Sequence, residues 1–170
     1  MSHDISRIAA WLQPRECLLD ADVPGRTQAL ELLAERVAQA HGIEPGLVYR
    51  ALWRRELSGS TALGNGFALP HAAIIGIAEP LTLFMRPKAS IDFDATDRQP
   101  VSQVLAILAP VGGSKTDHLQ LLALVAQLFS DRSFRAALDA VPDAAAADRV
   151  FQAGITHMTA ALQAESQHPV

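Results

Sequence analysis

Apolar residues recur at helical spacing in two regions of the N-terminal half of the chain. In the first region they stand at i, i+3, i+4 and i+7, at Leu30, Leu33, Ala34 and Val37. This spacing places them on one face and predicts a helix over about 24–41. Gly42 is expected to end it, because glycine accepts the left-handed conformation that follows many helices. Pro45 suits the first turn of a second helix, predicted to run to about residue 57.

Short continuous apolar runs, bounded by proline and aspartate, predict buried strands in the middle of the chain. Two such runs lie at 81–85 and 101–109, and a shorter one lies at 67–69, stopped by Pro70. An earlier apolar run closes at 18–19 and is compatible with a first strand.

Helical spacing returns after residue 113. Ser114 and Asp117 have the spacing of a capping box, with Asp where Glu or Gln is usual. The helix predicted behind them carries an apolar stripe made of Leu121, Leu124, Val125 and Leu128. Ser130 or Asp131 is expected to begin a further helix, and Pro142-Asp143 precedes a final Ala-rich helix.

Helices before, between and after strands predict the α/β class, with a central mixed β-sheet flanked by helices on both faces. The chain contains no linker-like stretch and no internal repeat. We therefore predict a single domain over 1–170 with a core of about 15–155. Residues 1–14 would form an N-terminal extension and residues 160–170 a fraying C-terminal tail.

Charge and composition narrow the classes of function. Fourteen basic and eighteen acidic residues give a net charge of −4, which argues against a protein that binds nucleic acid through its phosphates. The single Cys17 excludes an intramolecular disulfide and a Cys-rich zinc site, and its apolar neighbours predict a core position. Neither a signal peptide nor an apolar stretch long enough to span a membrane is visible, so a soluble cytoplasmic protein is expected.

Nucleotide and metal motifs are incomplete. Residues 64–66 begin like a dinucleotide fingerprint, but Leu69 stands where the third glycine belongs, and residues 111–116 lack the spacing of a P-loop. No two histidines lie three to five residues apart, as a zinc site would favour. The aspartates at 92, 94 and 97 lack the glycine and glutamate of a calcium loop and are predicted to be turn residues. We therefore expect no cofactor and no metal.

One segment, which ends at His71, is a candidate for a functional site. Residues 64–69 indicate a flexible glycine turn and a short strand, which Pro70 ends, and His71 follows just past the strand's edge. Pro70 pushes Leu69 toward extended geometry, so the approach to His71 is stiff. Small neighbours at 72 and 73 would leave the imidazole open to a large partner. A lone histidine after a strand is usually structural, so the residues alone leave both interpretations open.

A second histidine has a comparable position. His118 stands three residues before Leu121, on the apolar stripe in the first turn of its predicted helix. A helix N-terminus favours the neutral imidazole, and its free backbone N–H groups suit an incoming phosphate. A capping or packing role is the open alternative.

Taken together, these segments resemble a known active-site signature. Arg55-Glu56, Ser60-Thr61, residues 64–66 and Leu69-Pro-His71 look like the signature of enzyme IIA domains of the fructose/mannitol type, from the bacterial phosphoenolpyruvate-dependent phosphotransferase system. The resemblance continues through 91–95, 97–101, 109–110 and 116–119, and so covers roughly residues 18–151. The Gly-Ser-Thr form at 59–61 and the absence of a fused carrier or transporter domain favour the nitrogen-regulatory branch.

The resemblance implies a phosphotransferase component. His71 would be the phosphorylated residue, with Nε2 as the accepting atom, and His118 would stabilise the phosphoryl group. Arg55 would contact the phosphoryl group or the partner, with Arg54 beside it as the other candidate. The implied donor is an HPr-type phosphocarrier of the nitrogen branch, and the implied targets are regulatory partners such as kinases or transporters. No metal is required, because the donor is a phosphohistidine.

The chain departs from the family at one visible point. Members usually have Gly directly after the histidine, often followed by Lys, whereas this chain has Ala72 and Ala73. The departure bears on partner choice more than on chemistry. Two alternatives stay open: a sugar-specific enzyme IIA that passes phosphate to an enzyme IIB, and an interaction module that no longer transfers phosphate. Candidate rim residues around the histidine, equally compatible with the core, are Phe67, Ile74 and Ile75.

Overall fold

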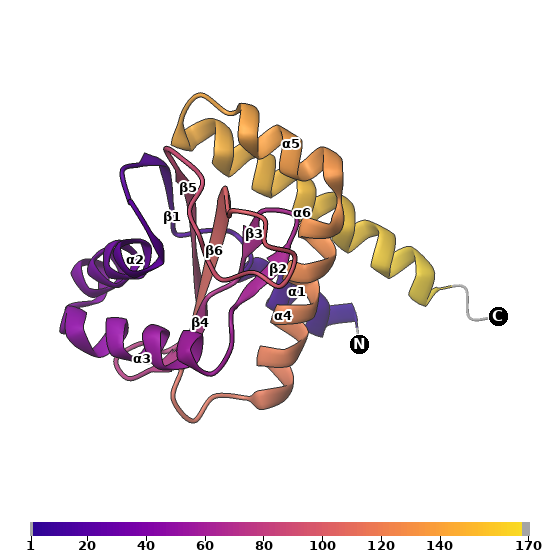
Figure 1. The fold of residues 1–170 in the computed structure, drawn as a ribbon. Coiled ribbons are helices and arrows are strands. Elements are labelled where there is room, and N and C mark those ends of the chain that lie inside the picture. Colours follow the sequence, from indigo (N-terminus) through magenta and orange to yellow (C-terminus); the bar gives the residue numbers. More distant parts are fainter. Residues whose placement is uncertain (1, 168–170) are drawn as a thin grey trace. The chain divides into compact units, whose positions relative to one another are not determined.

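The computed structural model describes residues 2–167, which lie in two compact units formed by 16–113 and by 2–15 with 114–167. The helices are α1 (Ser2–Ala10), α2 (Arg26–His41), α3 (Pro45–Leu57), α4 (Lys115–Ser130), α5 (Arg132–Ala140) and α6 (Ala144–Ser166). The strands are β1 (Glu16–Ala21), β2 (Ala62–Gly64), β3 (Phe67–Ala68), β4 (His71–Ile74), β5 (Leu81–Pro87) and β6 (Gln103–Pro110). Figure 1 labels these elements.

A mixed sheet forms the centre of the unit 16–113. Its strand order is β1-β5-β6-β3-β2, with β4 following β3 along the same side of β6. β1 pairs parallel with β5, and both β3 and β4 pair parallel with β6, whereas β5–β6 and β2–β3 are antiparallel. The predicted α/β class with a central mixed sheet is therefore confirmed.

Period-two alternation directs one face of the sheet toward α2 and α3, which lie beside it in Figure 1. The strand residues of this face that join the core with the two helices are Leu81, Leu83, Met85, Val104, Ala106 and Leu108. The intervening residues are buried as well, among them Phe84, Leu105 and Ile107. Burial of both faces explains why these strands appear in the sequence as continuous apolar runs.

Four helices make up the other unit, and side-chain caps set where three of them begin. The Ser114 hydroxyl accepts a hydrogen bond from the backbone N–H of Asp117 at the start of α4. Asp131 and Asp143 cap α5 and α6 in the same way, which satisfies backbone donors that have no partner inside a helix. Three phenylalanines pack edge to face or tilted in this unit, at 129, 134 and 151.

The predicted helices over 24–41 and 45–57 are confirmed by α2 and α3, and Asp131 rather than Ser130 begins α5. At the chain ends, the structure adds a helix to the predicted extension, and the predicted fraying of residues 160–166 was wrong. The extension 1–14 contains helix α1, whose Ile8 is fully buried. Residues 160–166 continue α6 instead of fraying, since alanine has the highest helix propensity and Met158 holds the helix by its burial. Residues 168–170 of the predicted tail lie outside the described residues.

The prediction that the strand over 67–69 stops at Pro70 is confirmed, because β3 ends at Ala68. The expectation that His71 lies past the edge of a strand was wrong, because His71 is the first residue of β4. Proline lacks an N–H donor, but the Pro70 carbonyl accepts a hydrogen bond from the backbone N–H of Ile107 at 2.9 Å. The pairing with β6 therefore continues across the proline. Among the described residues, no helix combines the length and apolar character needed to cross a membrane.

Candidate active site

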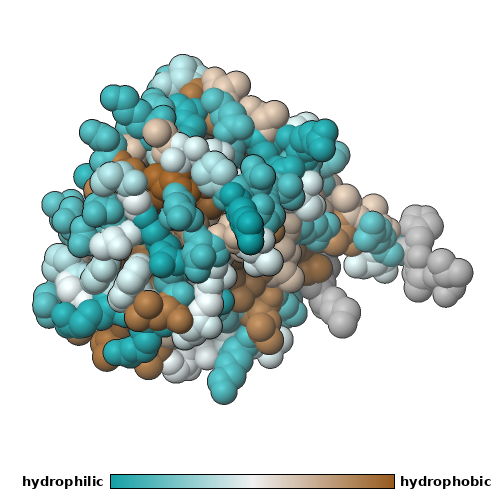
Figure 2. Space-filling model, viewed as in Figure 1, coloured by the Kyte–Doolittle hydropathy of each residue, from teal (hydrophilic) through white to brown (hydrophobic). Residues whose placement is uncertain are grey.

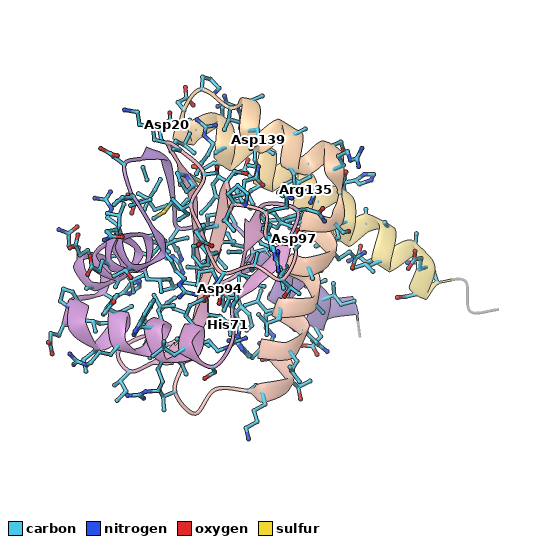
Figure 3. All side chains as sticks on the ribbon, in the orientation of Figure 1. Asp20, His71, Asp94, Asp97, Arg135 and Asp139 are labelled. Carbon is cyan, nitrogen blue, oxygen red and sulfur yellow. The ribbon has the colours of Figure 1, made fainter. Side chains whose placement is uncertain are left out.

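The imidazole of His71 is held by a hydrogen bond at each ring nitrogen. Nδ1 lies 2.8 Å from the backbone carbonyl oxygen of Leu69, and Nε2 lies 3.2 Å from Nε of Arg55. A carbonyl oxygen can only accept and an arginine Nε–H can only donate. The two contacts together select the neutral tautomer with the proton on Nδ1 and the lone pair on Nε2. Figure 3 shows His71 next to the C-terminal end of α3, the helix that carries Arg55.

The backbone before His71 explains this orientation. The Leu69 N–H donates to the carbonyl of Thr61 at 3.0 Å, and His71 is opposite Ile107 in the parallel pairing of β4 with β6. Both flanks of Pro70 are thus tied to neighbouring segments, and the Leu69 carbonyl has little freedom to turn away from the ring. The stiff approach expected from the sequence rests on these pairings as well as on the proline ring.

Arg55, and not Arg54, is the arginine at this histidine. It lies in the last turn of α3 and is half-buried, whereas Arg54 is exposed. Besides its bond to His71, Arg55 donates from Nη1 to the carbonyl of Gly59 at 2.9 Å. The guanidinium group is therefore held at two points, with its Nε–H directed at Nε2 of the imidazole.

A buried carboxylate organises the loop after α3. The side chain of Glu56 accepts from the backbone N–H of Thr61 at 3.2 Å and from its hydroxyl at 2.5 Å. Arg26 completes the group with an ion pair at 3.4 Å. Glu56 and Thr61 belong to the signature segments, but their spacing in the sequence indicates no role. Their contact forms only when the loop folds.

The glycine turn at 64–66 is structural. Gly64, Asn65 and Gly66 all have positive φ angles, a conformation that glycine and asparagine tolerate best. The carboxylate of Asp97 accepts from the backbone N–H groups of Asn65 and Gln99, at 2.9 and 3.0 Å. These donors hold the pKa of Asp97 below its usual value. Within the part of the chain that the structure describes, no group of side chains is arranged to hold a metal ion.

Small and apolar residues surround the histidine along β4. Of the three candidate rim residues, Phe67 and Ile74 are buried core residues, while Ile75 is 76% exposed. Leu57 and Leu63 are also exposed, and Figure 2 shows separate hydrophobic patches, one of them over α3. Ile75 is thus the one of the three that a partner could contact.

His118, the second candidate histidine, belongs to the other unit. It lies in the first turn of α4 and is half-buried, and this burial lowers the pKa of its imidazole. Desolvation disfavours the charged form, so His118 is neutral at neutral pH. The turn that carries it is held from α1, because Arg7 donates to both carboxylate oxygens of Asp117 at 3.1 Å.

Most of the chain matches a known protein family. The family model for the phosphoenolpyruvate-dependent sugar phosphotransferase system, EIIA 2, matches residues 11–154. A nitrogen regulatory protein of Bradyrhizobium diazoefficiens is 38% identical over 139 residues, covering 82% of this chain and 90% of that protein.

Two solved structures extend the comparison. Nitrogen regulatory protein IIA-Ntr from Neisseria meningitidis matches with a TM-score of 0.77 and 28% identity, over 85% of this chain and 99% of that one. The mannitol enzyme IIA of Escherichia coli, solved as a complex with phosphorylated enzyme IIB, matches with a TM-score of 0.67 and 17% identity. That match covers 81% of this chain and 94% of the other and shows a shared fold.

The family match spans both units and includes every candidate site residue. Proteins of this family are phosphotransferase components that accept phosphate on a histidine. The resemblance inferred from the signature residues is confirmed by the family model and by the relatives. The chain belongs to the EIIA 2 family of the phosphoenolpyruvate-dependent sugar phosphotransferase system.

Proposed function

We propose that the protein is a phosphocarrier of the nitrogen-regulatory phosphotransferase system. It accepts a phosphoryl group on Nε2 of His71 from the phosphohistidine of an HPr-type carrier, and it regulates partner proteins according to its phosphorylation state. The nitrogen regulatory proteins among its relatives support this branch. The donor implies a cytoplasmic site of action.

The observation that carries the proposal is the state of the His71 ring. Its proton is held on Nδ1 by the Leu69 carbonyl, so Nε2 carries the lone pair, which accepts the Arg55 Nε–H and becomes the nucleophile when that donor turns to the phosphoryl group. Phosphoryl transfer between histidines needs little covalent help from a protein beyond an unprotonated nitrogen in line with the phosphorus. A histidine held in the opposite tautomer would have to turn over or exchange its proton first.

The transfer step balances without a cofactor. The Nε2 lone pair forms a bond to phosphorus while the P–N bond of the donor phosphohistidine breaks, and its electron pair returns to the donor ring. The proton on Nδ1 of His71 stays in place and continues to bind the Leu69 carbonyl. The negative charge of the transferred group spreads over its three equatorial oxygens, which need donors already in position.

Arg55 is suited to be one of these donors. In the unphosphorylated protein its Nε points at Nε2, where the phosphorus must arrive, and Nη1 is held by the Gly59 carbonyl. A small rotation about the Gly59 contact would transfer the N–H groups of the planar fork from nitrogen to phosphoryl oxygen. We assign the second stabilising role to His118, on the resemblance and on its neutral imidazole.

The test is a reconstituted phosphorelay. Phosphoenolpyruvate, enzyme I and an HPr-type carrier are mixed with the protein, and intact mass is measured under neutral conditions. We expect one acid-labile phosphoryl group on the wild type and none on His71→Ala. His41→Ala is the matched control, because His41 is an exposed histidine of the same unit, and it should be labelled like the wild type. Full labelling of His71→Ala would overturn the proposal.

A second measurement separates the regulatory function from the sugar-specific one. The phosphorylated protein is mixed with enzyme IIB domains for fructose and for mannitol, and loss of its phosphoryl group is followed. We expect slow loss, at the rate of hydrolysis. Rapid transfer to either domain would identify a sugar-specific enzyme IIA, and failure of the wild type to take up phosphate at all would identify an interaction module.

A further inference from the structure

We propose that Glu56 is a positioning residue for phosphoryl transfer, which acts through Thr61 and Leu69 to set which nitrogen of His71 carries the proton. The inference rests on the proposed function, since a fixed tautomer matters only if His71 is a nucleophile. Glu56 touches neither the imidazole nor the position of the incoming phosphorus. Its effect is transmitted through hydrogen bonds in the loop after α3.

The first observation is the burial of the carboxylate. The Glu56 side chain is 0% exposed, yet it belongs to a residue type that is almost never buried unless paired. All of its described partners are donors: the N–H and hydroxyl of Thr61, and one guanidinium N–H of Arg26. A buried charge with this many directed contacts holds its partners in defined positions, because losing any one leaves the carboxylate undersatisfied.

The second observation is the path from this carboxylate to the imidazole. Glu56 fixes both the backbone and the side chain of Thr61, and the carbonyl of Thr61 accepts the N–H of Leu69 at 3.0 Å. The carbonyl of that same Leu69 accepts the Nδ1 proton of His71 at 2.8 Å. Two hydrogen bonds and the backbone of one residue, Leu69, therefore separate the Thr61 carbonyl from the proton that defines the tautomer.

A parallel contact links the same loop to Arg55. The backbone carbonyl of Glu56 accepts the N–H of Gly59, and the Gly59 carbonyl accepts Nη1 of Arg55. Gly59 has a φ of +146°, so the loop turns here in a conformation that a side chain would strain. The loop between Glu56 and Thr61 thus contacts Arg55 directly, through Gly59, and is linked to His71 through Leu69.

Arg26 supplies the charge balance to the carboxylate, at Oε1, the oxygen that also accepts the Thr61 N–H. It is partly exposed, and its guanidinium lies 5.2 Å from the ring centre of Trp53. This stacking holds the cation over α3, one turn before Glu56. The positive charge of Arg26 offsets the cost of burying the carboxylate, while the two Thr61 contacts orient the loop.

A purely structural role for Glu56 predicts a different result from a positioning role. If the carboxylate only stabilised the loop, its loss would lower the unfolding temperature and leave the His71 ring unchanged in the protein that remains folded. If it positions the ring, the folded variant would show a changed tautomer population. The ¹⁵N chemical shifts of the imidazole distinguish these cases, because protonated and unprotonated ring nitrogens resonate far apart.

Two matched pairs of variants make the test. Thr61→Val removes the hydroxyl contact while keeping the shape, and Thr61→Ser restores it. Glu56→Met removes both acceptors while filling the volume, and Glu56→Gln keeps one acceptor for the Thr61 amide. Ser58→Ala is the control, because the Ser58 hydroxyl is exposed and bonds only the Arg54 carbonyl among the described contacts. Each protein is labelled with ¹⁵N-histidine, checked for folding by circular dichroism, and assayed for phosphoryl uptake.

We expect Nδ1-protonated His71 in the wild type, in Thr61→Ser and in the control. In Thr61→Val and Glu56→Met we expect a mixture of tautomers and uptake slowed about tenfold or more, since small misplacements of a reacting group carry costs of this size. Glu56→Gln should show a tautomer population and an uptake rate between those of the wild type and of Glu56→Met. Wild-type ring shifts and uptake in the folded members of both pairs, or a loss of stability alone, would overturn the inference. The ring shifts need no phosphate, so they decide it even if the wild type accepts none.

Discussion

His71 and His118 are both half-buried, but they are held in different ways by the two units of the chain. His71 is held by directed contacts at both ring nitrogens, one from a backbone carbonyl and one from Arg55. His118 lies in the first turn of a helix whose start is capped by Ser114, and burial lowers the pKa of its imidazole. The first arrangement selects a tautomer and an orientation, whereas the second keeps a ring uncharged.

The difference teaches which histidine can serve as nucleophile and which as a neutral donor. A nucleophilic nitrogen needs a lone pair in a defined direction, which only specific partners can supply. A neutral donor needs mainly exclusion of water, which packing against a helix stripe supplies. Four experiments test this division of roles, of which the first should show the strongest effect and the last the weakest.

Replacing Arg55 should have the largest effect. Arg55→Ala removes the donor at Nε2 and the contact to Gly59, and we expect phosphoryl uptake to slow about 10²-fold, in the range found when one charge-stabilising donor is lost. Arg54→Ala is the control, because Arg54 is the exposed neighbour on the same helix turn. Uptake rates from the reconstituted relay check the prediction, and equal rates for the two variants would contradict it.

Replacing His118 should slow transfer less. His118→Asn removes the imidazole but keeps a polar side chain at the start of α4, and we expect uptake to fall about tenfold with His71 still labelled. The variant should keep wild-type circular dichroism, since asparagine is tolerated in a first helical turn. Complete loss of labelling in a folded His118→Asn protein would show that the division of roles between the two histidines is wrong.

Removing the cap of α4 tests whether the turn that carries His118 depends on its first hydrogen bond. Ser114→Ala deletes the acceptor of the Asp117 N–H, and we expect a loss of about 1 kcal/mol in the free energy of unfolding. Urea denaturation measures the change. Ser130→Ala, at the other end of the same helix, removes an exposed hydroxyl that bonds the Gln127 carbonyl and should cost clearly less.

Acid should reveal the burial of His118 through a small change in stability. Burial lowers its pKa in the folded protein, so the unfolded chain binds a proton first as the pH falls below about 6.5. Protonation therefore favours unfolding, and wild-type stability should fall between about pH 8 and pH 5.5. The stability of His118→Asn should fall less over the same window. Parallel urea midpoints for both proteins would exclude this contribution.

Periodic segments were predictable because their pattern is local. The stripes from Leu30 to Val37 and from Leu121 to Leu128 locate α2 and α4, and the unbroken apolar runs locate β5 and β6. The local pattern did not predict elements whose formation depends on packing or pairing with distant segments. Helix α1 buries Ile8, and Leu12 is buried just after it. The pairing with β6 continues past Pro70, because the Pro70 carbonyl accepts the N–H of Ile107.

The amino-acid sequence alone was enough to establish the family, to single out His71, and to narrow the arginine to two neighbours, since the signature is short and its order is specific. Only the tertiary structure shows that Arg55, and not Arg54, contacts His71, and that the proton of His71 lies on Nδ1. It also shows that the carboxylate of Glu56 binds Thr61. Each of these outcomes depends on the direction of a donor or acceptor. Such directions are determined by backbone geometry and by contacts between segments, which spacing along a chain does not contain.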